Sequence, residues 1–300
     1  MPTLTEVQAA TRHLVVQGDA RDLSWLDDGS VHLVVTSPPY GLLKTYADVP
    51  GQLGNGADPT NIDAYEEFLT ELDLCWRECA RVLVPGGRIC CVVGDVCLSR
   101  RAAGRHHVLP LPSDIQVRAR GLGLDNLTPI RWLKVANIKL EASLSSWYLG
   151  KPNLPGGIVK NDIETIVMLR KPGGYRKPTA EMEAASFIGT EDYRRLFRPV
   201  WDDIRGESGR RWKHPAPYPI ELSNRLIRMF SFVGDTVLDP FGGSGTTAIS
   251  ALDWGRDSIS IEIVPEYVET MQRRLSTLYP EATVERTTAK PFVDTSALAS

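Results

Sequence analysis

Short apolar runs that end in small or polar residues recur along the chain. These runs are rich in β-branched side chains and are too short for buried helices, which is typical of strands inside a sheet. The expected strands span residues 14–17, 31–35, 89–93, 130–134, 165–169, 236–238 and 258–261. Stretches with helical spacing separate several of them, so the pattern predicts an α/β fold.

The longest expected helix runs from Asp63 to Leu83, where apolar residues recur every three or four positions. Asp63 and Glu66 have the spacing of a capping box, and the Pro85–Gly87 sequence is expected to stop the helix. Further helices are expected after Pro219, before Trp254 and over Tyr267–Leu278. The tail after Glu285 is polar, and we expect it to be frayed.

The composition is that of an ordinary globular protein, with 42% hydrophobic and 24% charged residues. No apolar run approaches the length of a membrane span, and the first twelve residues lack the apolar core of a signal peptide, so we expect a cytoplasmic protein with no membrane partner. None of the five cysteines has metal-site spacing or follows a proline. The pair His106–His107 lacks a third ligand at useful spacing, so no metal is expected.

Charge is distributed unevenly, although the formal net charge is only −3. Residues 100–214 contain 21 Lys and Arg against 12 Asp and Glu, whereas the remainder contains 13 against 25. A basic segment of this kind is expected where a protein approaches phosphate groups. Solvated basic loops without a ligand explain the same count.

The sequence Thr36-Ser37-Pro38-Pro39-Tyr40 follows the apolar run 31–35 directly. Two prolines remove two backbone donors and hold the turn in an extended conformation. The Ser37 hydroxyl and the prolyl carbonyls are therefore acceptors beside the flat ring of Tyr40. This arrangement suits binding of the amino group of a planar heterocycle, and the alternative is a stiff turn without a ligand.

A second motif, Asp-Pro-Phe-Gly-Gly-Ser-Gly-Thr-Thr at 239–247, joins an expected strand to an expected helix. Glycines let the backbone approach a ligand closely, and a helix N-terminus presents free N–H groups. Glu262, 23 positions after Asp239, ends the next expected strand, where an acidic residue meets ribose hydroxyls in nucleotide sites. The combination predicts a nucleotide-like ligand.

Three such ligands compete for this loop. A phosphate-binding P-loop needs a lysine where Thr246 stands, so it is excluded. Residues 243–248 match the dinucleotide pattern G-x-G-x-x-G/A, which leaves a nicotinamide oxidoreductase as an alternative. Asp239 would repel a pyrophosphate and attract the cationic amino-acid end of S-adenosylmethionine, which favours the latter. A glycine-rich turn without a ligand is the remaining alternative.

Together the two motifs resemble those of the DNA amino-methyltransferases, enzymes that methylate an exocyclic base nitrogen. Their order, with Ser-Pro-Pro-Tyr first, resembles the circularly permuted beta class, and the N4-cytosine type within it. Gly18–Asp19 and the segments 81–88 and 214–219 also resemble blocks of this family, so the resemblance covers roughly two thirds of the chain.

The resemblance implies a Rossmann-like methyltransferase fold, that is, a doubly wound, mostly parallel seven-stranded sheet with one antiparallel strand. Residues 1–170 and 213–300 would form the catalytic domain that uses S-adenosyl-L-methionine. Residues 171–212, which are basic and aromatic, would form a small inserted target-recognition module. The two motifs would lie on neighbouring strands, although they are about 200 positions apart.

The resemblance also implies roles for individual residues. The catalytic turn would comprise Ser37, Pro38, Pro39 and Tyr40. The cofactor would be bound by Asp19 at the adenine, by Glu262 at the ribose, and by Asp239, Pro240, Phe241, Gly243, Ser244, Gly245, Thr246, Pro215 and Pro217 at the methionine part and the pocket wall. DNA would be contacted by Arg176, Lys177, Arg194, Arg195 and Arg198.

The implied partner is double-stranded DNA, from which the target base must be flipped out to be reached. In the family a serine at the first position of the turn goes mostly with cytosine, so Ser37 predicts N4-methylcytosine as the product. N6-methylation of adenine remains an alternative, as does a protein or RNA substrate. A cognate restriction endonuclease and the choice between monomer and homodimer are left open.

Overall fold

The computed structural model describes residues 11–39, 49–54, 58, 60–134, 155, 159, 161–207 and 218–289. Its strands are β1 (Arg12–Gln17), β2 (Val31–Thr36), β3 (Leu83–Val93), β4 (Val96–Leu98), β5 (His107–Leu109), β6 (Asp125–Asn126), β7 (Ile130–Leu133), β8 (Ile163–Arg170), β9 (Val200–Trp201), β10 (Thr236–Asp239), β11 (Asp257–Glu262) and β12 (Thr283–Thr288). Its helices are α2 (Ile62–Val82), α3 (Arg100–Ala103), α4 (Leu111–Gly121), α6 (Ala180–Ala185), α7 (Thr190–Leu196), α8 (Ile220–Phe230), α9 (Thr246–Asp253) and α10 (Pro265–Leu278).

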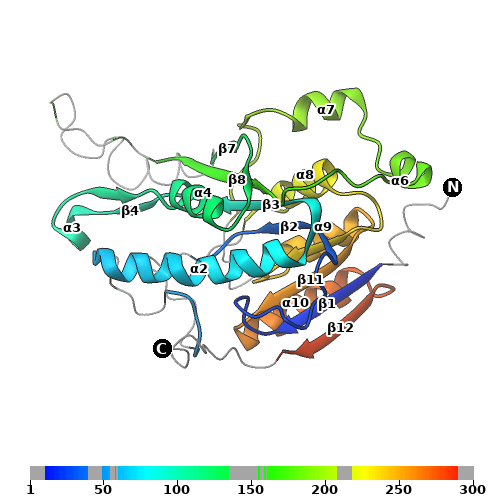
Figure 1. The fold of residues 1–300 in the computed structure, drawn as a ribbon, viewed down its shortest axis with the longest axis horizontal. Coiled ribbons are helices and arrows are strands. Elements are labelled where there is room, and N and C mark those ends of the chain that lie inside the picture. Colours follow the sequence, from blue (N-terminus) through cyan, green and yellow to red (C-terminus); the bar gives the residue numbers. More distant parts are fainter. Residues whose placement is uncertain are drawn as a thin grey trace.

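One large sheet organises the molecule, with the strand order β12-β1-β11-β10-β2-β3-β8-β7-β9 and β6 beside β8 (Figure 1). Strand β8 is antiparallel to β3, β6 and β7, and every other pair in this sheet is parallel. The mostly parallel sheet with one antiparallel strand is therefore confirmed. The sheet has ten strands in the described part of the chain instead of seven, because β6, β9 and β12 join it.

Strand β12 corrects the expectation of a frayed tail. It pairs in parallel with β1 from Thr283 opposite Arg12 to Thr288 opposite Gln17. Most of its side chains are exposed, so the strand is held by backbone hydrogen bonds at the sheet edge. A polar edge strand of this kind leaves no hydrophobic pattern in the sequence, which is why we did not expect it.

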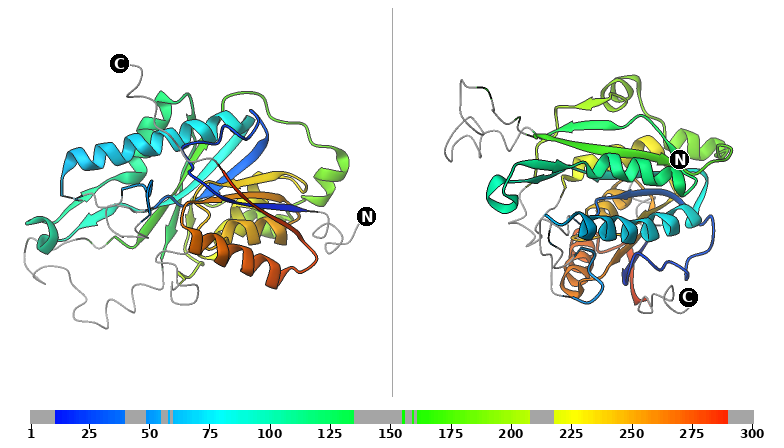
Figure 2. Two further views of the ribbon diagram at one scale, coloured as in Figure 1. Left: turned by 90° about the horizontal axis from the view of Figure 1, so that it is seen from below. Right: turned by 60° about the vertical axis from the view of Figure 1, so that its left-hand side comes forward.

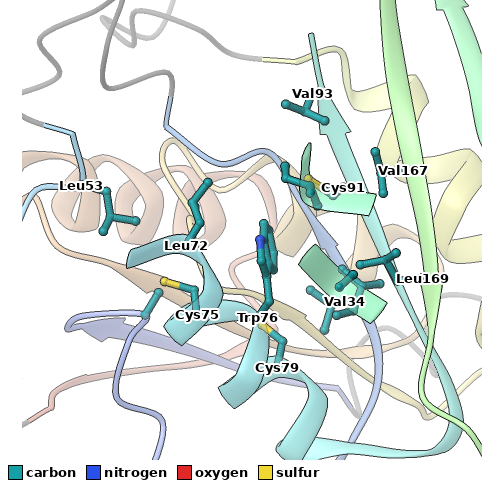
Figure 3. Packing of buried hydrophobic residues seen from close by; sticks show 14 of the residues in the cluster. Val34, Leu53, Leu72, Cys75, Trp76, Cys79, Cys91, Val93, Val167 and Leu169 are labelled. Atoms are coloured by element: carbon teal, nitrogen blue, oxygen red, sulfur yellow. The ribbon is translucent and has the colours of Figure 1, made fainter. Parts of the chain in front are cut away.

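Helices cover both faces of the sheet, as a doubly wound fold requires (Figure 2). Alternate residues of one strand serve opposite faces, because Val34 packs in the cluster that includes α2, whereas Leu33 and Val35 pack in the cluster that includes α8. Trp76 of α2 lies at the centre of the first cluster, beside Cys79 and Cys91 (Figure 3).

Helix α2 differs from the expected helix at both ends. Asn61 caps α2, with its side-chain oxygen accepting from the Asp63 N–H at 2.9 Å, so the capping box at Asp63 was wrong. The helix ends at Val82 and β3 begins at the next residue, so the Pro85–Gly87 sequence lies inside a strand. Gly86 has φ of 78°, and the register of β3 against β2 shifts there, which is typical of a β-bulge.

The basic stretch 100–112 contains α3 and β5, and β5 pairs with β4 in a small separate hairpin. Part of the segment 171–212 is also integrated into the fold, because β9 pairs with β7 and Trp201 is buried in the core. No helix in the described ranges is long and apolar enough to cross a membrane.

Candidate active site

A pocket with about 610 Å³ of empty space lies where the parallel strands β1, β2, β10 and β11 end, which we call the carboxyl edge. Its lining comprises Gly18, Asp19, Ala20, Ser37, Pro38, Pro39, Gly51, Gln52, Leu53, Pro240, Phe241, Glu262, Ile263, Val264 and Tyr267. Because β2 pairs directly with β10, the Ser-Pro-Pro turn and the glycine loop are neighbours at this edge. The expected meeting of the two motifs is confirmed, whereas Tyr40, Pro215 and Pro217 lie outside the described residues.

Glu262 is the acidic group that the pocket holds most firmly. Its two carboxylate oxygens accept separate backbone hydrogen bonds, from Gly243 at 2.8 Å and from Val264 at 2.9 Å. Burial raises the pKa of Glu262 to about 7, and these hydrogen bonds only partly oppose that shift. The carboxylate is therefore fixed in orientation, and no cationic side chain of the described residues pairs with it, which leaves acceptor capacity for hydroxyl groups of a ligand.

Asp239 lies beneath the pocket and does not line it, because its side chain is buried within the sheet. Thr36 donates to one carboxylate oxygen and Thr247 to the other, both at 2.6 Å, and the Phe241 N–H adds a bond at 3.1 Å. Burial raises the pKa of Asp239 to about 6. Asp239 thus joins Thr36, the last residue of β2 and the one before Ser37, to the first turn of α9.

The glycine loop also differs from a simple ligand cradle. Gly243, Ser244, Gly245 and Thr246 are buried and do not line the pocket. Gly245 has φ of 83°, and a Cβ there would lie 2.5 Å from a side-chain carbon of Met271 in α10. The glycine is therefore required for close packing against α10 as well as for the backbone conformation.

Asp19 lines the pocket, but its carboxylate is already engaged. Arg21 donates to one oxygen at 3.0 Å through Nε and to the other at 2.6 Å through Nη2. Arg21 also pairs with Glu71 of α2 at 2.9 Å. This arginine fixes the loop after β1, and nothing in the local sequence pattern predicted it.

Comparison with known proteins agrees with this geometry. The model of the DNA methylase family matches residues 31–273. The chain belongs to this family. The type II methyltransferase M.MjaI of Methanocaldococcus jannaschii is 34% identical over 283 residues, which cover 87% of this chain and 90% of that relative. Membership of the DNA methylase family decides against the nicotinamide alternative.

Solved structures show the same fold. TTHA0409 of Thermus thermophilus, complexed with S-adenosyl-L-methionine, superposes with a TM-score of 0.75 and 48% identity, over 94% of this DNA methylase and 99% of that chain. The PvuII DNA methyltransferase, which is cytosine-N4-specific, superposes with a TM-score of 0.61 at 20% identity, over 92% and 95% of the two chains. The second likeness concerns the fold alone.

Several pocket residues of this DNA methylase were missed at the sequence level, among them Gln52, Leu53 and Tyr267. Gln52 and Leu53 come from the polar segment after the catalytic turn, and Tyr267 was assigned only to an apolar helix face. The Gln52 side-chain oxygen is buried without a hydrogen-bond partner among the described residues, which is expected of a group that meets a ligand. The length and polarity of the segment containing Gln52 were the only available signal.

The five basic residues expected to contact DNA are not gathered at the pocket. Arg176 pairs with the buried Asp235, which precedes β10 and therefore lies at the opposite, amino edge of the sheet. Arg195 lies 3.6 Å from Asp192, and Arg198 lies 3.0 Å from Asp202. Lys177 and Arg194 are exposed. DNA contact by these residues stays a prediction.

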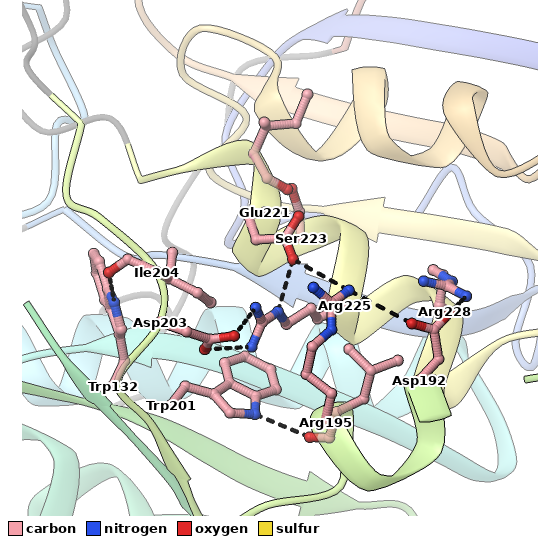
Figure 4. A network of polar contacts seen from close by, with 12 residues as sticks. Trp132, Asp192, Arg195, Trp201, Asp203, Ile204, Glu221, Ser223, Arg225 and Arg228 are labelled. Atoms are coloured by element: carbon pink, nitrogen blue, oxygen red, sulfur yellow. Dashed lines mark hydrogen bonds and ion pairs between the residues drawn. The ribbon is translucent and has the colours of Figure 1, made fainter. Parts of the chain in front are cut away.

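A network of ion pairs holds the α7 region against α8 (Figure 4). Arg225 of α8 is bidentate to Asp203, at 2.9 and 2.8 Å, and its guanidinium lies 5.2 Å from the centre of the Trp201 ring. Arg228 of the same helix pairs with Asp192 at 2.6 Å. These arginines lower the pKa of both aspartates. The ion pairs therefore attach the segment 190–203 to α8.

Proposed function

We propose that the protein transfers a methyl group from S-adenosyl-L-methionine to the N4 amino group of a cytosine flipped out of double-stranded DNA. The observation that carries this proposal is the shared pocket, where Ser37 and Pro38 form a wall together with Phe241 and Glu262. A nucleoside-type methyl donor and an amino group would meet there. The type II names of relatives such as M.MjaI support a role in restriction–modification, with a cognate endonuclease as a further partner.

The residues of the pocket fit the cofactor. Glu262 presents a fixed carboxylate for two ribose hydroxyls, and Phe241 and Tyr267 supply aromatic surface for the adenine. The S-adenosyl-L-methionine complex of TTHA0409 supports this assignment at 48% identity. When bound, the cofactor supplies an electrophilic methyl group on its sulfonium.

The catalytic turn would act on the nitrogen lone pair. An exocyclic amino group is conjugated with its ring and is therefore a poor nucleophile. Acceptors at the Ser37 hydroxyl and the Pro38 carbonyl would bind its N–H bonds and hold the lone pair toward the methyl group. Asp239 would position this turn through Thr36. No covalent intermediate is required: four of the five cysteines are buried, and Cys97, which is exposed, does not line the pocket.

The choice of cytosine rests on Ser37. A hydroxyl can donate to the ring N3 of cytosine and also accept from its amino group, whereas a carboxylate only accepts. The N1 atom of adenine is an acceptor too, so the preference for cytosine comes from the resemblance, in which a serine at this position goes mostly with cytosine. The family model covers DNA methylases in general, so the product requires its own experiment.

Mass spectrometry of nucleosides from DNA treated with protein and labelled S-adenosylmethionine tests the proposal. Label in N4-methylcytosine is the expected result, and Ser37→Ala protein that still binds the cofactor is the control. Label in N6-methyladenine alone would overturn the cytosine assignment, whereas no labelled nucleoside together with tight cofactor binding would overturn DNA as the substrate.

A further inference from the structure

We propose that the β4–α3–β5 hairpin, residues Val96–Leu109, is a contact surface for the phosphate backbone of double-stranded DNA. The inference rests on the proposed function and adds where the substrate lies. Three arginines, Arg100, Arg101 and Arg105, are concentrated in this element. No acidic residue occurs from Val96 to Ser113, so the hairpin itself carries no carboxylate; the nearest in sequence are Asp95 and Asp114 on either side.

These arginines lack partners in the described part of the chain, unlike most others there. All three are exposed, and none makes an ion pair or hydrogen bond with another residue in the described ranges. His106 is exposed next to them. Arginines that are free of carboxylates retain their full capacity to replace the counterions of DNA phosphates.

The hairpin also lies on the correct side of the molecule. Strand β4 begins three residues after β3 ends at Val93, so the hairpin extends from the carboxyl edge, where the pocket lies. Figure 1 shows α3 and β4 at the end of the molecule to which β3 leads. DNA whose flipped base occupies the pocket must pass over this edge.

The base of the hairpin is anchored by buried residues and strand pairing, whereas its arginines are exposed. Val96 and Leu98 of β4 are 1% exposed, and Leu111 just beyond β5 is fully buried in the core cluster with α2. β4 and β5 pair from Val96 opposite Leu109 to Leu98 opposite His107. Because the backbone of the hairpin is already ordered, binding would cost mainly the side-chain entropy of the arginines.

Three arginines of the region expected to recognise DNA differ from those of the hairpin, because they have carboxylate partners. Arg176 pairs with Asp235 at the amino edge, and Arg195 and Arg198 have carboxylates within 4 Å. The charge of these three arginines is therefore partly compensated within the protein, whereas Lys177 and Arg194 are exposed and have no ion pair among the described residues. The comparison favours the hairpin as the main electrostatic contact.

The test is the salt dependence of duplex binding, measured by fluorescence anisotropy on the full chain. Three triple variants are compared with wild type: Arg100→Gln/Arg101→Gln/Arg105→Gln in the hairpin, Arg194→Gln/Arg195→Gln/Arg198→Gln in the α7 region, and Arg77→Gln/Arg273→Gln/Arg286→Gln as a charge-matched control on α2, α10 and β12. Calorimetry with S-adenosylmethionine verifies that each variant is folded and has an intact pocket.

We expect the hairpin variant to bind DNA roughly tenfold more weakly and to lose up to about 2.7 from the log–log salt slope, since each phosphate contact contributes about 0.9. The charge-matched control should keep the wild-type slope. A hairpin variant with the wild-type slope, or a larger loss in the α7 variant, would overturn the inference. These outcomes are read in a wild-type protein that methylates DNA, whereas a wild type that binds the cofactor and leaves DNA unmethylated contradicts the proposed function itself.

Discussion

Two groups of carboxylates in this protein have different partners, and their pKa values shift in opposite directions. At the carboxyl edge, Asp239 and Glu262 are buried and accept hydrogen bonds from neutral N–H and O–H groups, and their pKa values rise to about 6 and about 7. In the α7–α8 network, Asp192 and Asp203 are bound by arginines, which lower their pKa values.

This difference in partners distinguishes carboxylates that bind a ligand from carboxylates that hold two elements of the fold together. A carboxylate bound by arginine has its charge compensated and holds two elements together. A buried carboxylate without a cation destabilises the folded state, and such groups are concentrated at sites that bind or react. The comparison therefore assigns ligand chemistry to the carboxyl edge and stability to the network around Arg225.

The largest expected effect is on catalysis, from Ser37→Ala. Loss of a positioned hydrogen-bonding group should lower kcat by about 10²–10³, by analogy with the loss of an oxyanion-hole donor. The thermal midpoint of unfolding and the affinity for S-adenosylmethionine should stay near wild type. Single-turnover methylation and calorimetry measure these quantities, and normal turnover would mean that the turn is only structural.

In the α7–α8 network, we expect a substitution to lower stability and to leave cofactor binding unchanged. Arg225→Ala leaves Asp203 without its bidentate partner and removes packing from Trp201, so the free energy of unfolding should fall by about 2–4 kcal/mol. The KM for S-adenosylmethionine should change little at a temperature where the variant is folded. Urea unfolding provides the first value, and a cofactor defect with unchanged stability would contradict the division between the regions.

Glu262→Gln should act on binding. The amide keeps the shape but presents one acceptor oxygen instead of two, and it meets one of the backbone N–H groups with an NH₂ group. We expect a loss of about 1.5–3 kcal/mol in cofactor affinity, roughly tenfold or more. Asp203→Asn is the matched control at the network. Equal losses of cofactor affinity in both variants would contradict the assignment of ligand binding to the carboxyl edge.

The smallest expected effect is the pH dependence of cofactor affinity. Because the pKa of Glu262 is raised to about 7, its carboxyl group is protonated in the ligand-free protein at lower pH and must lose that proton to accept two hydroxyls. The affinity should therefore rise with pH, by about tenfold from pH 6 to pH 8, and level off above. Calorimetry of wild type and Glu262→Gln decides this, since the variant should lack the transition near pH 7.

The sequence was a good guide wherever hydrophobic pattern and motif coincide. Strand β2 is mostly apolar, β10 has an apolar centre, and β11 alternates serine with isoleucine, so their positions and the residues that follow them could be predicted. The polar edge strand β12 could not, because it is held mainly by backbone pairing with β1 and contributes only Val284 to a hydrophobic cluster. The bulge at Gly86 was likewise concealed, since Pro-Gly-Gly is as typical of a helix end as of an irregular strand.

Within the site, residue types were easier to predict than partners. Ser37, Phe241 and Glu262 line the pocket as expected. Asp239 does not, because its two oxygens are engaged by Thr36 and Thr247, which are distant from each other in sequence. The pairing of Arg21 with Glu71 and of Arg176 with Asp235 has the same origin, since these ion pairs depend on tertiary distances that a motif does not contain.

The strand order has a consequence for biosynthesis. Strands β1 and β2 are only 13 residues apart in sequence, from Gln17 to Val31, yet β11 and β10 lie between them in the sheet. Until the last quarter of the chain has left the ribosome, both N-terminal strands therefore have an unpaired side, a state that favours aggregation. Completion of the central sheet must await the synthesis of β10 and β11, so the nascent chain acquires its pocket only after Glu262 has left the ribosome.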